Sequence, residues 1–321
     1  MKNVSNTLLY IVIVFTLSAT VNSQTYNIMS YNIRYDNDWD VQNSWQNRRH
    51  KVEQLLRYYA PAIFGLQEGL PNQVNFIDSC FSNYSYVGVG REDGIAKGEF
   101  CPLFFDTLKF TISDYATFWL SETPQSVSVG WDAALERICT YGLFEDKITK
   151  EKFWVFNTHF DHVGSLARKK SSELILKKID EVNNTLYPVV LMGDLNSLPN
   201  STPIQVLKFQ LSDAQEISST TLYGPVGTFN GFDKDLKIDK RIDYFFTSKM
   251  KTLSYAHIDD RLDDNKHISD HLPVLIKIRL FPLRRIKFDS NNDYYSLGAL
   301  LLNIFFIHHQ FLIHSIIPNW F

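Results

Sequence analysis

Cysteine is scarce in this chain, with three residues in 321, at positions 80, 101 and 139. An odd count leaves at least one thiol unpaired, and the spacing matches no cysteine-based metal site. We therefore expect a fold that does not depend on disulfides, and we exclude a structural zinc centre of the cysteine type.

An excess of positive charge is also lacking, because 32 Lys and Arg face 35 Asp and Glu, a net charge of −3. A protein that coats a polyanion through backbone electrostatics is normally basic, so that class is disfavoured. There is no internal repeat and no low-complexity linker, and 45% of the residues are hydrophobic. We predict one domain over residues 24–280.

The two ends of the chain differ from this body. Residues 1–23 combine Lys2, an apolar stretch over 8–17 and a small residue at Ser23, which predicts a signal peptide. A retained membrane anchor is the alternative, although the run is short for a span. Residues 281–321 form a hydrophobic extension of unknown role, which could make weak membrane contact. We expect an exported protein: periplasmic, secreted or membrane-associated.

Hydrophobic periodicity predicts a mixed series of strands and helices. Strands are expected at 26–33, 62–66, 84–89, 102–105, 110–115, 138–144, 153–157, 189–192, 242–247, 253–258 and 273–280. Helices are expected at 47–59, 72–81 and 167–182. Helices do not follow every strand, which favours an α/β fold with two sheets packed face to face and helices outside.

The most informative segment is PVVLMGDLNSLP, residues 188–199. Its apolar run, with Pro before it and turn residues after it, predicts a buried strand. Residues i and i+2 at a strand end point to the same side, so Asp194 and Asn196 can converge just outside the sheet. The Asp could deprotonate an attacking water and the Asn could hold it. A plain strand-to-turn exit is the alternative, because Asp, Asn and Gly also form turns.

Other predicted strands also end or begin in polar residues of this kind. They are Asn32, Glu68, His159, Asp161, Asp243, Asp270 and His271. Each alone is more often a solvated side chain, a cap or a surface ion pair, but the repetition at strand edges favours a shared site. Hard oxygen ligands without a cysteine cluster favour Mg²⁺ or Mn²⁺.

Six short motifs carry a resemblance to a known family. They are SYNIR (30–34), LQE (66–68), NTH (157–159), GDLN (193–196), RIDY (241–244) and SDHLPV (269–274). In this order they resemble the endonuclease/exonuclease/phosphatase (DNase I-like) family, above all its exported bacterial members and its deadenylase-like branch. The resemblance implies a four-layer α/β/β/α sandwich of two mixed sheets and a divalent metal.

The same resemblance implies roles for single residues. Glu68 is implied to be the principal metal ligand, with Asn32 and Asp270 beside it. The ion would be Mg²⁺ or Mn²⁺.

The catalytic roles implied by the resemblance fall on five residues. Asp194 would activate water, and Asn196 would orient that water and the phosphate. His271 would contact the scissile phosphate with Asp243 as its carboxylate partner, and His159 would stabilise the phosphate or the leaving group. Such a carboxylate would hold the tautomer of an imidazole and raise its pKa.

Three weaker candidates remain open. Arg91, in the Gly-rich stretch 88–98, and Arg137 could bind substrate, although a solvated hairpin tip explains this stretch equally well. Residues 36–45 form a polar loop with Trp39 that could stack on a base or a sugar. A packed loop without such a role is the favoured interpretation there.

Together these observations predict a Mg²⁺-dependent phosphoester hydrolase, either a phosphodiesterase or nuclease or a phosphatase, in which an Asp-activated water attacks phosphorus in line. The alternative is a non-catalytic protein that binds a phosphate ligand on the same scaffold. The substrate stays open between nucleic acid, a sugar or inositol phosphate and a lipid headgroup, and no obligate protein partner is implied.

Overall fold

The computed structural model describes residues 24–281, which contain two sheets and four α-helices. The strands are β1 (Thr25–Asn32), β2 (Ile63–Gln67), β3 (Tyr84–Val87), β4 (Leu103–Asp106), β5 (Phe110–Trp119), β6 (Ile138–Asp146), β7 (Lys152–His159), β8 (Val189–Asp194), β9 (Ser212–Asp213), β10 (Asp243–Ser248), β11 (Met250–His257) and β12 (Val274–Leu280). The helices are α1 (Trp45–Tyr59), α2 (Pro71–Cys80), α3 (Ser165–Val182) and α4 (Thr202–Leu207), with a 3₁₀ helix, η1, over Asp38–Asn43.

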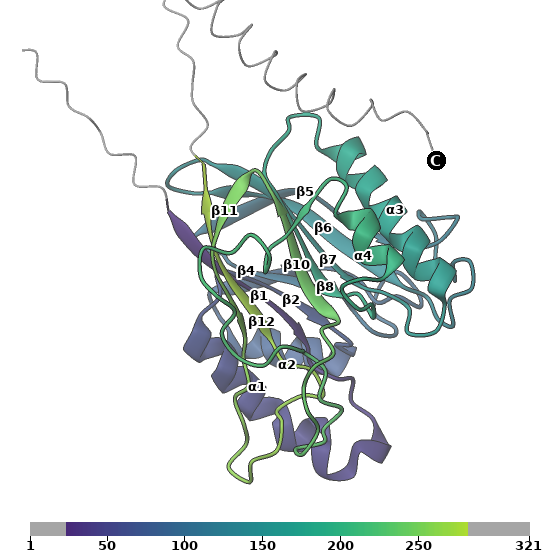
Figure 1. Ribbon diagram of the computed structural model, residues 1–321, viewed down its shortest axis with the longest axis vertical. Coiled ribbons are helices and arrows are strands. Elements are labelled where there is room, and N and C mark those ends of the chain that lie inside the picture. The colour runs from purple at the N-terminus through teal and green to yellow at the C-terminus, as the bar shows by residue number, and fades with distance from the viewer. Residues whose placement is uncertain (1–23, 282–321) are drawn as a thin grey trace, which may run out of the picture. The chain divides into compact units, whose positions relative to one another are not determined.

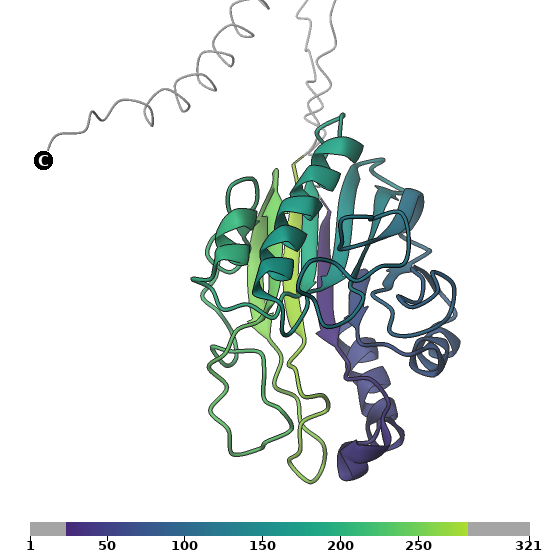
Figure 2. The same cartoon turned by 90° about the vertical axis from the view of Figure 1, so that its right-hand side faces the viewer.

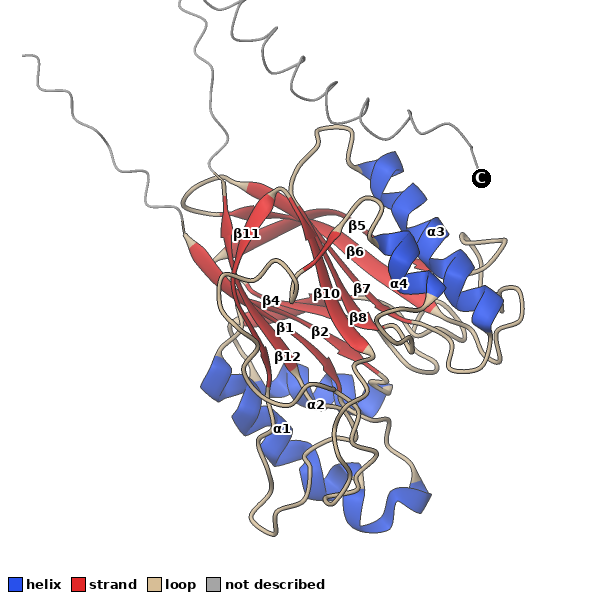
Figure 3. Cartoon of the chain, viewed as in Figure 1, coloured by secondary structure: helices blue, strands red, loops and turns tan. Residues whose placement is uncertain are grey.

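Both sheets are six-stranded and mixed. The first has the order β11-β12-β1-β2-β4-β3, and the second has the order β5-β6-β7-β8-β10-β9. Each contains one parallel pair near its centre, β1–β2 in the first and β7–β8 in the second, while the other pairs are antiparallel. Figure 3 shows the strands of both sheets gathered between the helices.

Three hydrophobic cores hold four layers together. One core lies between α1 and α2 and the first sheet, the second lies between the two sheets, and the third lies between the second sheet and α3 and α4. Figure 1 shows α1 and α2 on one side of the sheets and α3 and α4 on the other, and Figure 2 shows α3 and α4 in front of the strands. The predicted four-layer sandwich is confirmed.

The apolar runs are continuous because both faces of the central strands are buried. In β8, Val190 and Met192 enter the core between the sheets, whereas Val189 and Leu191 pack against the outer helices. Alternate residues of a strand point to opposite faces, so a strand covered on both sides needs apolar residues at every position.

The sequence of helix α1 explains its buried face and the point at which the helix ends. Val52, Leu55 and Leu56 form its buried face. The helix ends at Ala60 in the left-handed conformation, with its N–H bonded to the Leu56 carbonyl. Pro61 follows and cannot continue the helix, which is the reason the chain turns into β2 at this point.

The predicted elements are present with small shifts at their ends, and four features were missed. Strand β5 runs on to Trp119 past a register shift between Ser113 and Ala116, which breaks the alternation of its apolar residues. Helix α4, η1 and β9 are too short for a periodic pattern to reveal them.

The predictions for the two ends of the chain fall outside this structure. The predicted signal peptide, 1–23, and all of the extension 281–321 except Phe281 lie outside the described residues. Between residues 24 and 281, no helix is both long and apolar enough to cross a membrane.

Candidate active site

The central strands of both sheets deliver polar residues to one edge of the sandwich. In the first sheet, Asn32 at the end of β1 pairs with Gln67 at the end of β2, directly before Glu68. In the second, His159 at the end of β7 pairs with Asp194 at the end of β8, which also pairs with Asp243. Parallel strands end on the same side, so the topology itself gathers these side chains.

Gly193 allows the second sheet to form at this edge. Its φ is +148°, and a Cβ atom built there would lie 1.9 Å from the carbonyl oxygen of Thr158 on β7. Any other residue would push β7 and β8 apart at the point where they present His159 and Asp194. The glycine of the GDLN motif is therefore required by the close approach of two backbones.

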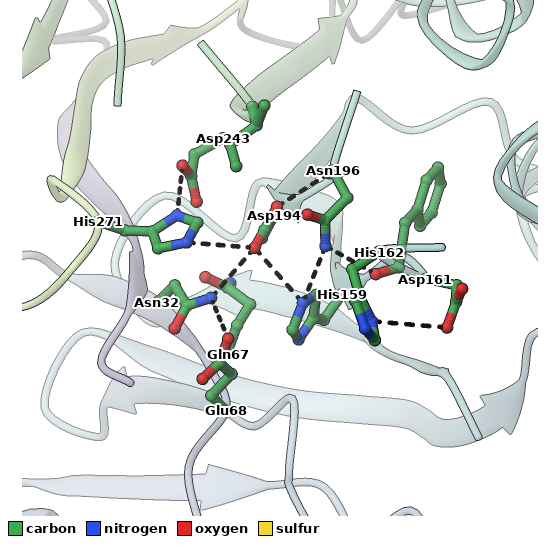
Figure 4. A network of polar contacts seen from close by, with 12 residues as sticks. Asn32, Gln67, Glu68, His159, Asp161, His162, Asp194, Asn196, Asp243 and His271 are labelled. Carbon is green, nitrogen blue, oxygen red and sulfur yellow. Dashed lines mark hydrogen bonds and ion pairs between the residues drawn. The ribbon is translucent and has the colours of Figure 1, made fainter. Parts of the chain in front are cut away.

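Asp194 occupies the centre of the cluster and is 1% exposed. Its Oδ1 accepts the backbone N–H of Asn196 at 2.9 Å, and its Oδ2 accepts Nδ2 of Asn32 at 3.1 Å (Figure 4). The same Oδ2 lies 3.4 Å from Nε2 of His159 and 3.7 Å from Nε2 of His271. Burial, reinforced by Asp243 and opposed by His271, raises the pKa of Asp194 to about 7. A carboxylate with this pKa can accept a proton at neutral pH.

Asn196 is held beside this carboxylate. Its φ is +44°, a left-handed conformation that Asn tolerates better than most residues. Its Nδ2 donates to the carbonyl oxygen of Phe160 at 3.0 Å. The structure therefore brings Asp194 and Asn196 to one point, as the spacing of the motif predicts.

Oxygen donors gather on the side of the first sheet. Nδ2 of Asn32 donates to Oε1 of Glu68 at 3.0 Å, and Oε2 of Glu68 accepts the backbone N–H of Tyr35 at 3.2 Å. Asp270 is buried, and Nη1 of Arg34 lies 3.7 Å from its Oδ2. Burial, with the negative charge of Glu68 nearby, raises the pKa of Asp270 to about 6. This crowding of carboxylates is the environment that a hard divalent cation would neutralise.

The donor set fits the predicted ion. Ligand atoms of Glu68, His159 and Asp194 lie within 4.8 Å of one another, and so do those of Asp194, Asp243 and His271. The donors are carboxylates and imidazoles with the amide of Asn32 beside them and no thiolate among them, so these groups could hold a divalent cation.

His271 forms a hydrogen-bonded pair with Asp243. Its Nδ1 lies 2.9 Å from Oδ2 of Asp243, and the ring is 4% exposed. Burial alone would lower the pKa of His271, but the carboxylates of Asp243 and Asp194 outweigh it and hold the pKa well above its usual value. These carboxylates favour the protonated ring, in which Nδ1–H is donated to Asp243 and Nε2–H faces the pocket.

His159 is held in the opposite state. Nη1 of Arg137, which only donates, lies 3.1 Å from Nδ1 of His159, and the acceptor Oδ2 of Asp194 lies 3.4 Å from Nε2, so the neutral ring is best served by a proton on Nε2. Nδ2 of Asn196 lies 3.2 Å from the same Nε2. Burial lowers the pKa of His159 well below its usual value, and Arg137 and Arg91 act in the same direction. The ring is a neutral donor whose Nε2–H faces Asp194.

The two weaker candidates, Arg91 and Arg137, both line the same pocket and are both buried. Arg91 pairs with Glu99 at 2.7 Å, and burial raises the pKa of Glu99 to about 7. Asp93, at the tip of the same stretch, accepts three backbone N–H groups of its own loop. The Gly-rich stretch therefore has a pocket-facing base and a solvated tip.

Asp161 and His162 have a different role from His159. Oδ1 of Asp161 accepts the backbone N–H groups of Val163 and Gly164 at 2.9 and 2.7 Å, just before α3 begins. His162 is half exposed, and its Nδ1 lies 3.0 Å from Nη2 of Arg137. These contacts order the turn behind the site.

Four residues that take part in the site have no role assigned to them in the sequence analysis. Arg34 stands at the end of the first motif and Glu99 directly follows the Gly-rich stretch, so both lie in or next to segments already noted. Thr228, whose Oγ1 accepts the backbone N–H of Asp243 at 3.1 Å, and Phe229, whose ring lies 5.1 Å from that of His271, come from an irregular stretch without periodicity.

All ten predicted site residues therefore lie at one edge of the sandwich, around one cavity of about 990 Å³. Nine of them stand at strand ends or in the loops beside them and line the cavity or contact a lining residue, and Arg91 reaches it from the Gly-rich stretch. The cavity is lined by Arg34, Tyr35, Asp36, Asn37, Asp38, Trp39, Glu68, Leu70, Arg91, Glu92, Glu99, Leu135, Arg137, His159, His162, Asp194, Asn196, Phe229, Lys240, Ile242, Asp270 and His271.

Known proteins are similar to this chain in sequence or in fold. Uncharacterized protein L388 of Acanthamoeba polyphaga mimivirus is 27% identical over 251 residues, which cover 72% of this chain and 91% of that protein. An endonuclease/exonuclease/phosphatase family protein of Bacteroides thetaiotaomicron has 34% identity and a TM-score of 0.77, over 81% of this chain and 99% of its own. Mannosyl-6-phosphatase Bt3783 of the same species has 35% identity and a TM-score of 0.76, over 79% and 99%.

The match to a family extends over most of the described chain. A model of the Endonuclease/Exonuclease/phosphatase family matches residues 29–271, from the first strand to His271. This range contains five of the six motifs whole and the first three residues of the sixth, and it spans every strand except the start of β1 and all of β12. The chain therefore belongs to the endonuclease/exonuclease/phosphatase family.

Proposed function

We propose that this chain is a metal-dependent phosphatase that removes the phosphate from a sugar phosphomonoester. The observation that carries the proposal is the position of Asp194, a buried carboxylate that faces the imidazoles of His159 and His271 and the amide of Asn32. This arrangement offers a base for water and two N–H donors for phosphate at the same point.

The chain's own residues divide the reaction between them. Asp194 accepts a proton from the water whose oxygen bonds to phosphorus, and Asn196 helps to orient that water. The Nε2–H groups of His271 and His159 donate to phosphate oxygens as negative charge grows on them. The bond between phosphorus and the sugar oxygen breaks on the opposite side, and the sugar oxygen takes a proton from solvent.

Glu68, Asn32 and Asp270 would hold the metal. When bound, a divalent cation neutralises charge on the phosphate and the leaving oxygen. Arg34, which faces Asp270, keeps this carboxylate side of the pocket in place.

A sugar phosphate is favoured over nucleic acid on two grounds. Mannosyl-6-phosphatase Bt3783 has 35% sequence identity to this chain, and the match covers 79% of this chain. The lining of the cavity contains seven Asp and Glu side chains against four Arg and Lys, with three His beside them, which disfavours a long polyanion but tolerates a single phosphate among the Arg and His groups. A non-catalytic binding protein is less favoured, because it would not require a base, its orienting amide and two imidazoles together.

The test is phosphate release by the full chain. Mannose 6-phosphate, inositol phosphate and single-stranded DNA are incubated with Mg²⁺, with Mn²⁺ and with EDTA. We expect release from the sugar phosphate, none in EDTA, and recovery when Mg²⁺ is added back. Cleavage of DNA in preference to the sugar phosphate would overturn the substrate assignment, and turnover that survives EDTA would overturn the metal requirement.

We also propose that the protein is exported. The support is the charged start, apolar stretch and small residue of positions 1–23. Fractionation of a bacterial host that expresses the full chain, compared with a variant that lacks residues 2–23, tests this. Recovery of both forms in the same compartment would contradict it.

A further inference from the structure

A large aromatic side chain stands exposed on the wall of the catalytic pocket. Trp39, in the 3₁₀ helix η1, is 70% exposed, and it lines the same cavity as Glu68 and Asp194. Single exposed apolar residues are ordinary on a protein surface, but one on a catalytic wall is available to substrate.

The loop that carries Trp39 is built to keep it there. The guanidinium of Arg34 binds both carboxylate oxygens of Asp40 at 2.9 and 3.2 Å. Asn37 accepts the backbone N–H of Asp40 at 2.9 Å, which caps η1, and donates to its carboxylate at 2.7 Å. The bonds on both sides of Trp39 hold the backbone in place, so the ring is presented without a large entropic cost on binding.

A second set of bonds ties the start of this loop to helix α2. The backbone N–H of Asp36 donates to Oε1 of Gln73 at 2.9 Å, and Oδ2 of Asp36 accepts Nδ2 of Asn72 at 2.8 Å. Gln73 also donates to the carbonyl oxygen of Arg34 at 2.9 Å. The wall is therefore anchored to the layer of helices that packs on the first sheet.

The chemistry of this wall selects the kind of group that fits it. The Trp39 ring offers an apolar face, and Asp36 and Asp38, which also line the cavity, offer hydrogen-bond acceptors. The one cation of the segment 34–39, Arg34, is already engaged by Asp40. An anionic leaving group would meet repulsion here, whereas a neutral ring with many hydroxyl groups could stack on the indole and donate to the carboxylates.

We propose that Trp39 is a specificity-determining residue that stacks on the sugar ring of the leaving group, with Asp36 and Asp38 as acceptors for its hydroxyl groups. This inference rests on the proposed function, because it gives a binding place to the sugar of the substrate whose phosphate lies at Asp194. It also explains why residues 36–38 are polar while the neighbouring Trp39 is left in solvent.

The experiment compares two phosphomonoesters that differ in their leaving group. Mannose 6-phosphate presents a ring, and glycerol 3-phosphate presents a short chain that cannot stack. For Trp39→Ala we expect the ratio of kcat/KM for mannose 6-phosphate to that for glycerol 3-phosphate to fall about tenfold, mainly through KM. Trp39→Phe, which keeps an aromatic face, should recover most of the ratio.

Phe209→Ala is the matched control. Phe209 is 84% exposed and does not line the catalytic cavity, so its loss should leave the ratio unchanged. Equilibrium binding of mannose 6-phosphate to Asp194→Asn, with and without Trp39→Ala, should show the same tenfold weakening without turnover.

The outcomes separate the inference from the function beneath it. A change of less than twofold in the ratio, or an equal loss for both substrates, would overturn the stacking role while phosphate release by the wild-type chain continues. Failure of the wild-type chain to release phosphate from either substrate would contradict the proposed function and, with it, the stacking role of Trp39.

Discussion

The two sides of the pocket each hold a buried histidine, and the two are held in opposite states. His159, on the second sheet, is 5% exposed and has its pKa lowered well below the usual value. His271, just before the last strand of the first sheet, is 4% exposed and has its pKa raised well above it. Both rings point Nε2 at the same oxygen of Asp194.

The difference lies in the partner of the other ring nitrogen. Nδ1 of His159 meets the guanidinium of Arg137, whereas Nδ1 of His271 meets the carboxylate of Asp243. Burial disfavours the charged form of both rings, so neighbouring charge decides which one becomes an imidazolium. The site thus obtains two donors that differ in charge from two residues of the same type, histidine.

The largest effect on turnover is expected from Asp194, the residue that both histidines contact. Asp194→Asn keeps the shape of the side chain but removes its ability to accept a proton, and we expect kcat to fall about 10⁴-fold. Steady-state phosphate release measures this. Asp180→Asn, an exposed change on α3, is the control and should retain wild-type turnover. Residual activity within tenfold of wild type would remove Asp194 from its role as base.

The next effect tests the asymmetry between the histidines directly. His271→Asn removes a charged donor, and we expect a loss of about 10³-fold in kcat. His159→Asn removes a neutral donor, and we expect about 10²-fold. The two variants are measured side by side at neutral pH with saturating Mg²⁺. If the His159 variant is the more damaged, the division of roles proposed for the two sides is wrong.

A smaller effect should follow when His159 loses its partner. Arg137→Met frees Nδ1 of His159, so the ring is no longer restricted to the tautomer that presents Nε2–H, and we expect kcat to fall about tenfold with little change in KM. His162→Ala removes the half-exposed ring on the other nitrogen of the same guanidinium and should leave kcat within twofold. Equal losses in both variants would indicate a structural role for Arg137.

The smallest effect on turnover is expected at His257, a buried histidine at the end of β11. Burial lowers the pKa of His257 to about 4, and its Nδ1 lies 2.7 Å from the carbonyl oxygen of Pro225. Between this value and its ordinary pKa of about 6.5, the unfolded chain binds more protons than the folded one, so stability falls as the pH falls through this window.

From pH 7 to pH 5, His257 should therefore remove about 2 kcal/mol from the free energy of unfolding. His257→Asn can still donate to Pro225 but does not titrate, so it should show a shallower loss than the wild-type chain. Urea unfolding at the two pH values measures the difference. Parallel losses in the two proteins would mean that His257 is protonated in the folded state.

The fold was largely predictable because its central strands are buried on both faces. Continuous apolar runs such as Val189–Met192 mark such strands whatever their neighbours are. The strand β5 and the helix α4 were the harder parts, since a register shift breaks the alternation of the first and six residues are too few for a helical period in the second.

The residues of the site were predictable where they follow a strand. Asn32, Glu68, His159 and Asp194 all stand at strand ends, where a polar residue after an apolar run is visible in the sequence. Thr228 and Phe229 were not predictable, because they reach Asp243 and His271 from a stretch without periodicity.

The sequence by itself determined the strands, the polar residues at their ends and the family motifs, because these follow from local patterns along the chain. Only the tertiary structure decided the charge of each group. The pKa of an imidazole depends on which charges lie within a few ångströms of it, and Arg137 and Asp243 come to His159 and His271 from other strands. The position of Trp39 on the catalytic wall has the same origin, since it depends on bonds between the loop after β1 and helix α2.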